Sequence, residues 1–248
     1  FIKGRVHLPV YRTLYLDKLL EEKEGLYTNR DQTFREMVKN FKTISDADYE
    51  VPASLKRTLR SYQKNGFKWL KTLQSCQFGG ILADDMGLGK TLQVISVLLA
   101  AKNETREGTS LVVAQASLVF KWGEEFARFA PELKISLITG TQEERQARIN
   151  AFGESDVLVT SYDLLKRDIH LYEEKEFLYE IIDEAQYIKN HTTAAARAVK
   201  VVRSRIRYAL TGTPIENRLS ELWSIFDYLM PGFLYGYDVF KKEMEIPI

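Results

Sequence analysis

The feature that most constrains this chain is a glycine-rich stretch, ILADDMGLGKT, at residues 81–91. An apolar run leads into it and an amphipathic helical pattern follows, so the stretch is expected to join a strand to a helix. Gly87 and Gly89 let the backbone curl so that successive N–H groups point inward, beside the partial positive charge of the helix N-terminus. The stretch therefore predicts a phosphate-binding loop, in which Lys90 would reach the β- and γ-phosphates and Thr91 would bind Mg²⁺.

The match to the strict phosphate-loop pattern is partial, because Asp84 stands where that pattern has its first glycine. A strand-to-helix turn whose glycines serve only close packing is the alternative. The strand expected before the loop and the helix expected after it favour the phosphate site.

Composition bounds the class of protein. The chain has 248 residues, of which 45% are hydrophobic, enough for one large or two small domains. Its longest uninterrupted apolar run, residues 97–101, is far shorter than the ~20 residues that span a bilayer. The single cysteine, Cys76, excludes an internal disulfide and fits a reducing, cytoplasmic location. The chain starts at Phe1 and stops at Ile248, so a piece of a longer protein is expected.

Charge gives no direct indication of a partner. The formal net charge is +1, but residues 51–80 and 185–207 each contain lysines and arginines and no acidic residue. These local basic segments could meet phosphates, or they could be ordinary solvated helix faces.

Apolar strands and helical segments are expected to alternate along the chain. Strands are expected over residues 110–114, 134–138, 156–160, 177–183 and 207–210. Helices are expected over residues 92–102, 118–129, 142–152, 163–174, 194–202 and 218–229. An earlier amphipathic helix, with Ser54 as its N-cap, is expected to carry Lys71 on its solvated side. The alternation predicts an α/β fold, with a mostly parallel sheet covered by helices on both faces.

Three polar motifs accompany these elements. Asp183 and Glu184 follow an expected buried strand, where one carboxylate would lie near Mg²⁺ and the other would orient and deprotonate an attacking water. The sequence LTGTP at residues 210–214 follows another strand and, taken alone, is an ordinary strand exit. Gln63 offers the donor and acceptor that complement the adenine edge, although an isolated glutamine is more often merely exposed.

In this order, the motifs resemble the Swi/Snf family of DNA-translocating ATPases in helicase superfamily two. The resemblance covers about residues 55–234 and is carried by LRSYQ (59–63), LADDMGLGKT (82–91), VLVTSY (157–162), DEAQ (183–186) and LTGTPIEN (210–217). Residues 1–50 are similar to the segment that precedes the motor in bacterial members. The resemblance implies a leader over residues 1–50 and a first RecA-like lobe over residues 51–248.

The resemblance also implies roles for individual residues. ATP and Mg²⁺ would be the cofactors, with Lys90, Asp183 and Glu184 catalytic and with Thr91 and Asp183 on the metal. The nucleotide would be bound by Arg60, Gln63, Asp84, Asp85, Met86, Gly87, Leu88, Gly89, Lys90 and Thr91. Duplex DNA would be contacted by Ser117, Lys121, Trp122, Thr160, Ser161 and Tyr162. Coupling between the ATP site and the DNA contacts would involve Gln186, Thr211, Gly212 and Thr213.

Gln115 and Lys121 depart from the usual family residues, which bears on contact with DNA rather than on the ATP site. A second RecA-like lobe, which would supply arginine fingers, is expected to follow residue 248. The alternative function, from another class, is a nucleotide-gated DNA-binding or scaffolding module that binds ATP without turning it over.

Overall fold

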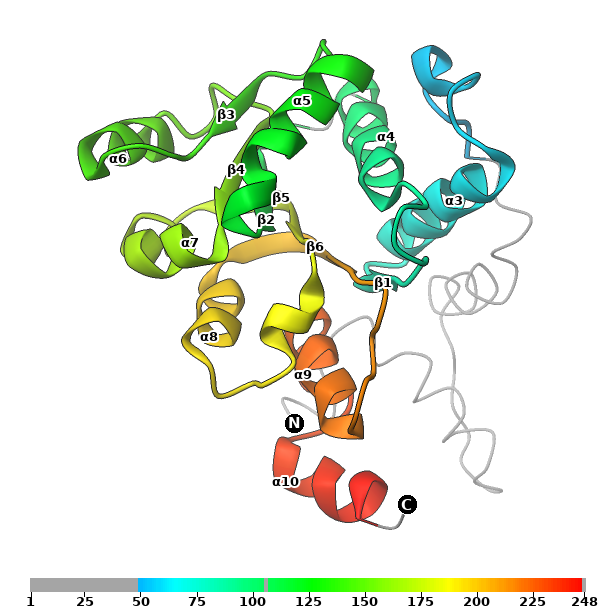
Figure 1. Ribbon diagram of the computed structural model, residues 1–248, viewed down its shortest axis with the longest axis vertical. Coiled ribbons are helices and arrows are strands. Elements are labelled where there is room, and N and C mark those ends of the chain that lie inside the picture. The colour runs from blue at the N-terminus through cyan, green and yellow to red at the C-terminus, as the bar shows by residue number, and fades with distance from the viewer. Residues whose placement is uncertain (1–48, 105–106, 247–248) are drawn as a thin grey trace, which may run out of the picture.

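A computed structural model describes residues 49–104 and 107–246 (Figure 1). Apart from residues 49 and 50, the predicted leader lies outside the described residues. Within the described residues, no helix is both long enough and apolar enough to cross a membrane.

The centre of the fold is a six-stranded sheet in the order β1-β6-β5-β2-β4-β3, and all of its pairings are parallel. The strands are β1 (Gly80–Leu82), β2 (Ser110–Ala114), β3 (Ile135–Leu137), β4 (Val157–Ser161), β5 (Glu176–Ile182) and β6 (Arg203–Leu210). Val112 of β2 lies opposite Ile181 on one side and Val159 on the other, and all three are buried. Burial on both faces explains the continuous apolar runs of the central strands.

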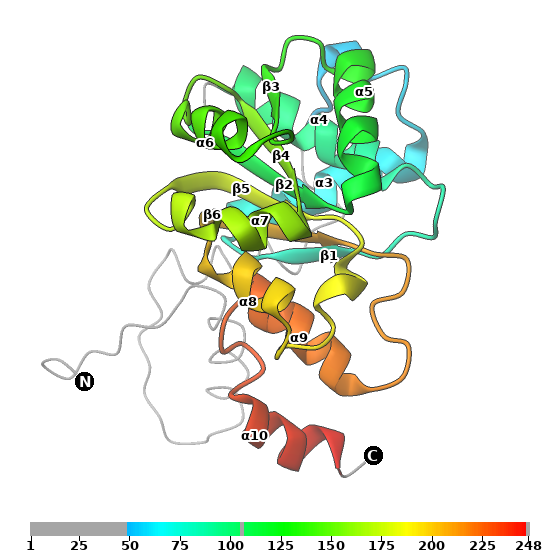
Figure 2. The same ribbon diagram turned by 60° about the vertical axis from the view of Figure 1, so that its left-hand side comes forward.

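Helices cover both faces of the sheet, as Figure 2 shows. One face carries α3 (Ser61–Ser75), α4 (Lys90–Asn103) and α5 (Val119–Phe129), and the other carries α7 (Tyr162–Asp168), α8 (Ala194–Val201) and α9 (Leu219–Leu229). The helix α6 (Gln142–Asn150) lies near the β3 end of the sheet, and α10 (Tyr237–Phe240) lies beyond α9. Short connecting turns are η3 (Ala53–Leu55), η4 (Ala116–Leu118), η5 (Ile169–Leu171), η6 (Ala185–Ile188) and the π-helical η7 (Lys241–Glu245). The predicted α/β architecture is confirmed.

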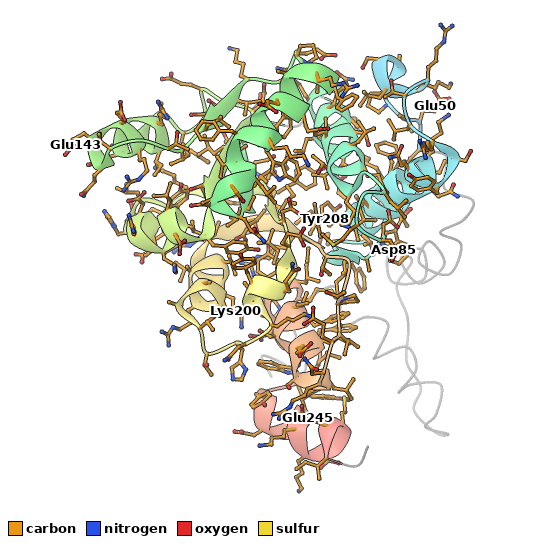
Figure 3. All side chains as sticks on the ribbon, viewed as in Figure 1. Glu50, Asp85, Glu143, Lys200, Tyr208 and Glu245 are labelled. Atoms are coloured by element: carbon orange, nitrogen blue, oxygen red, sulfur yellow. The ribbon has the colours of Figure 1, made fainter. Side chains whose placement is uncertain are left out.

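Packing against the sheet decides which helix residues are apolar. Helix α4 is buried from Leu92 to Ala101 because it contacts α3 on one side and α5 on the other. Tyr208, labelled in Figure 3, donates a hydrogen bond from its buried hydroxyl to the Leu70 carbonyl at 2.6 Å, which ties α3 to β6.

The structure corrects several local expectations. Ser54 does not cap the first amphipathic helix, because the chain forms the turn η3 there and α3 begins only at Ser61. Lys71 is buried rather than solvated, because it forms an ion pair with Glu104 at 2.8 Å.

Other element ends also differ from expectation. The helix expected over residues 163–174 ends at Asp168, and the strand expected from residue 207 begins at Arg203. Asp168 ends the helix where its carboxylate meets Arg145 of α6, with Nε–Oδ2 and Nη2–Oδ1 distances of 2.6 and 2.9 Å.

Removal of one partner from the ion pair of Arg145 and Asp168 is expected to be strongly destabilising, because both side chains are more than nine-tenths buried. The variant Arg145→Met leaves a buried carboxylate without its partner and is expected to lower the free energy of unfolding by about 3 to 5 kcal/mol. Urea unfolding measures the change. The matched variant Arg205→Met breaks an ion pair whose side chains are 63% exposed, and should cost less than about 1 kcal/mol. Equal losses of unfolding free energy in the two variants would contradict the special importance of the buried Arg145–Asp168 pair.

Candidate nucleotide site

The glycine-rich loop joins β1 to α4 at the carboxyl edge of the sheet. Gly87 and Gly89 have φ angles of 84° and 73°, in the left-handed region that favours glycine. Gly89 is the N-cap of α4, and a Cβ atom there would lie 2.5 Å from Nε2 of Gln63. Both glycines are therefore favoured by backbone conformation, and a side chain at position 89 would also displace the amide of Gln63.

Lys90 lies over the loop that precedes it. Its Nζ donates to the backbone carbonyls of Asp84 at 2.8 Å and of Asp85 at 3.3 Å. The Asp84 carboxylate accepts a 2.7 Å hydrogen bond from Nε2 of Gln93, which is fully buried in α4. An aspartate thus fits where the strict pattern has glycine, because its side chain is tied back to the helix.

Gln93 is a site residue that sequence reasoning missed. It is one of two polar residues in the otherwise apolar stretch of residues 92–101, and that exception was a signal that could have found it.

The acidic pair follows directly after β5. The Asp183 carboxylate accepts hydrogen bonds from the Trp122 indole N–H at Oδ2 and from the Glu184 backbone N–H at Oδ1, both at 2.9 Å. Burial raises the pKa of Asp183 above its ordinary value, and the hydrogen bond from Trp122 opposes this shift. Glu184 adopts a left-handed backbone conformation with φ of 52°, and its Oε2 accepts from Nε2 of Gln186 at 2.8 Å.

The residues predicted to couple the two sites form a chain of hydrogen bonds that starts at Glu184. Oε1 of Gln186 accepts from the Thr211 hydroxyl at 3.2 Å, and Oγ1 of Thr211 accepts from the Thr213 N–H at 3.1 Å. Gly212 lies beside Met86 of the glycine-rich loop. A Cβ atom placed on Gly212 would be 3.3 Å from Cγ of Met86. The end of β6 is thereby connected to both the acidic pair and the loop.

These elements surround one cavity of about 480 Å³. Its walls include Met86, Gly87, Gly89, Lys90, Thr91, Asp183 and Glu184, together with Leu118, Lys121, Trp122, Glu125 and Phe129 from η4 and α5. The structure therefore gathers the predicted catalytic and metal residues, which lie far apart in the sequence, in one place.

The donor set in this cavity fits Mg²⁺. Mg²⁺ in nucleotide sites is commonly held by one or two protein oxygens together with substrate phosphates and waters. Thr91 and Asp183 supply one hydroxyl and one carboxylate in the same cavity. Within residues 49–104 and 107–246 there is no cluster of three or more histidine, cysteine or acidic side chains that would suggest a metal cage formed by protein alone.

Gln63 is engaged within the protein. Its Oε1 accepts from the Arg60 backbone N–H at 2.9 Å, and its Nε2 donates to the Leu88 carbonyl at 3.0 Å. The Tyr62 hydroxyl donates to the same carbonyl at 3.1 Å. Gln63 therefore braces the loop, and recognition of adenine by its remaining hydrogen and lone pair stays a prediction.

The residues predicted to face DNA divide into two groups. Ser117 and Lys121 are exposed, whereas Trp122, Thr160, Ser161 and Tyr162 are buried. Ser161 caps α7 by accepting from the Leu164 N–H, and the Tyr162 hydroxyl donates to the Asp183 carbonyl at 2.9 Å. These four side chains pack inside the fold, and contact between the predicted residues and DNA stays a prediction.

The burial of Trp122 had a signal in the sequence. Val119, Trp122 and Phe126 recur at intervals of three and four, the spacing of one buried helix face.

A parallel sheet, a glycine-rich loop between β1 and α4, and a carboxylate pair after β5 define a nucleotide-binding lobe of the RecA-like class. The family model described as "SNF2-related domain" matches residues 62–248. A second model, "bacterial SNF2 helicase associated", matches residues 1–52. The chain belongs to the SNF2-related family, as its motifs indicated.

Several known proteins are similar in sequence to this chain over part of their length. An uncharacterized ATP-dependent helicase of Mycoplasma genitalium is 44% identical over 75% of this chain and 18% of its own. The TATA-binding protein-associated factor MOT1 of Saccharomyces cerevisiae is 37% identical over 91% of this chain and 13% of its own. The solved Sulfolobus solfataricus SWI2/SNF2 ATPase core in complex with dsDNA has a TM-score of 0.71 and 43% identity, over 81% of this chain and 41% of that chain. The chain thus spans less than a quarter of these two curated relatives.

Proposed function

We propose that this chain is the ATP-binding first lobe, with a leader over residues 1–50, of a DNA-dependent ATPase that moves on duplex DNA and remodels protein–DNA complexes. The observation that carries the proposal is the single cavity into which Lys90, Asp183 and Glu184 converge. The solved relative in complex with dsDNA supports duplex DNA as the partner. We also propose a cytoplasmic location, which the single buried cysteine supports.

The residues of the cavity divide the chemistry among them. Lys90 and the N-terminus of α4 would neutralise phosphate charge, and the loop N–H groups would cradle the phosphates. Thr91 and Asp183 would hold Mg²⁺, whose chemistry is to neutralise charge on the phosphate oxygens. Glu184 would orient the attacking water and accept its proton.

A second RecA-like lobe of the same polypeptide would complete this cavity. Phosphoryl transfer develops charge on the γ-phosphate, and arginines from the opposite side of a cleft stabilise that charge. The described lobe would provide one wall of such a cleft. Closure of the two lobes would also exclude water and couple hydrolysis to movement along DNA.

The alternative is a nucleotide-gated DNA-binding or scaffolding module without turnover. The full-length protein distinguishes the two functions through steady-state phosphate release with and without duplex DNA. Stimulation by duplex DNA supports the ATPase. Binding of ATP and DNA without phosphate release would instead support the module.

Removal of the loop lysine tests the site itself. We expect Lys90→Ala to weaken binding of Mg²⁺-ATP by about 10- to 100-fold, because a charge-assisted hydrogen bond contributes roughly 1.5–3 kcal/mol. Equilibrium titration with a fluorescent ATP analogue measures the affinity. Lys102→Ala is the matched control, because Lys102 lies in the last turn of the same helix and pairs with Asp156. An unchanged affinity in Lys90→Ala contradicts the placement of the phosphate site.

A further inference from the structure

The hydrogen bond between Trp122 and Asp183 joins two motifs that lie 61 residues apart in the sequence. The Trp122 side chain is only 2% exposed, and its N–H donates to Oδ2 of Asp183. The Glu184 N–H donates to the other oxygen, Oδ1. Each carboxylate oxygen therefore has one donor, and the two donors together specify how the carboxylate is turned.

The donor is itself held in place. Trp122 packs against Phe126, one helical turn further along α5, with ring centroids 5.7 Å apart. Helix α5 in turn contacts β3, β4 and α4. A fully buried ring on a helix that packs against the sheet has little freedom to turn, so the indole N–H is a preorganised donor.

Burial alone does not explain this contact. A buried indole N–H needs an acceptor, and a backbone carbonyl can serve, as the Tyr235 carbonyl does for Trp223 at 3.2 Å. In Trp122 the acceptor is instead a carboxylate that lines the nucleotide cavity, and Trp122 lines the same cavity. Donors to a metal-binding carboxylate fix its orientation and leave its other lone pairs for the metal.

We propose that Trp122 is a positioning residue for Asp183: its indole N–H holds the carboxylate in the orientation that accepts the divalent cation of the nucleotide. The inference rests on the proposed nucleotide function. Helix α5 also presents the exposed side chains of Phe120, which is 61% exposed, and Lys121. Helix α5 thus links Asp183, the proposed metal ligand, to the surface formed by Phe120 and Lys121.

The test replaces the donor and keeps an aromatic ring. Trp122→Phe removes the N–H but preserves packing against Phe126, and Mn²⁺ replaces Mg²⁺ as a paramagnetic probe. Titration of Mn²⁺ in the presence of ADP, followed by electron paramagnetic resonance, is expected to show metal affinity lowered by about 10- to 100-fold. Binding of ADP in EDTA should stay within twofold, since the phosphate loop is untouched.

Trp223→Phe is the matched control, because it also removes a buried indole N–H but from the far side of the sheet. Its Mn²⁺ affinity should equal that of the unmodified chain. A Trp122→Phe chain that melts cooperatively and binds Mn²⁺ within twofold of the unmodified chain overturns the proposal. If the unmodified chain binds no Mn²⁺–ADP, the proposed function fails, and the role of Trp122 fails with it.

A second measurement applies if Trp122→Phe does not fold. The chain has three tryptophans, and Trp69→Phe and Trp223→Phe assign their indole ¹⁵N–H resonances by elimination. Addition of Mg²⁺–ADP to the unmodified chain should shift the Trp122 resonance and leave the other two unchanged. The same addition to Asp183→Ala should leave all three unchanged. A Trp122 resonance that does not respond in the unmodified chain overturns the proposal.

Discussion

Residues 1–248 alone are expected to release phosphate from ATP about 10³ to 10⁵ times more slowly than the same protein extended through a second lobe. The range is the usual contribution of an arginine finger to phosphoryl transfer. In the described lobe the cavity is bounded by the glycine-rich loop, α5 and the acidic pair. Without an opposing wall, water weakens electrostatic stabilisation of the developing charge. Steady-state phosphate release from the two polypeptides measures the difference.

Duplex DNA should add little to the rate of the shorter polypeptide, because no closure of two lobes can occur in it. Measurement over a range of protein concentrations controls for association, since a second copy could supply an arginine in trans. Suppose instead that duplex DNA strongly stimulates phosphate release and that the turnover number per polypeptide is the same at every protein concentration. This lobe would then be catalytically complete on its own.

The second large effect is expected for Glu184→Gln in the polypeptide that includes the second lobe. An amide keeps the shape of the side chain but cannot accept the proton of the attacking water, so turnover should fall by about 10²- to 10⁴-fold. Affinity for ATP should be nearly unchanged, because Glu184 is assigned no contact with the ground-state phosphates. Single-turnover hydrolysis and equilibrium titration measure the two quantities separately.

Glu176→Gln provides the matched control. It makes the same chemical change at the opposite end of β5, where the Glu176 side chain is 63% exposed and pairs with Arg205. Its turnover should equal that of the unmodified enzyme. Full turnover in Glu184→Gln would exclude Glu184 as the general base.

Sequence patterns predicted the sheet and the loop because both depend on local signals. The central strands are runs of apolar residues bounded by polar ones, and β2 was predicted at its observed bounds, Ser110–Ala114. Gly87 and Gly89 stand where the backbone has positive φ, which few other residues tolerate. The order of the motifs also allowed the family to be recognised, and the comparison with known families confirmed it.

Local patterns failed where contacts distant in sequence decide the structure. The amphipathic pattern predicted a helix that begins after Ser54, but Leu55 and Leu59 are buried from η3 and the turn after it. Similarly, Lys71 faces the interior because Glu104, 33 residues away, neutralises it there. The position of Trp122 against Asp183 depends on how α5 packs against α4, β3 and β4. These contacts join residues that are distant in the sequence, so a local pattern does not predict them.

Under the proposed function, the left-handed backbone of Glu184 would set catalysis against stability at one residue. A residue other than glycine in this conformation costs roughly 1–3 kcal/mol, and here it begins η6 directly after β5. The unfavourable conformation is held by the strand before it and by the hydrogen bond from Gln186. A glycine at this position would relieve the strain and remove the carboxylate together. In the proposed function Glu184 is the general base, so selection for a more stable lobe would favour its loss, whereas selection for turnover would keep the strained residue in place.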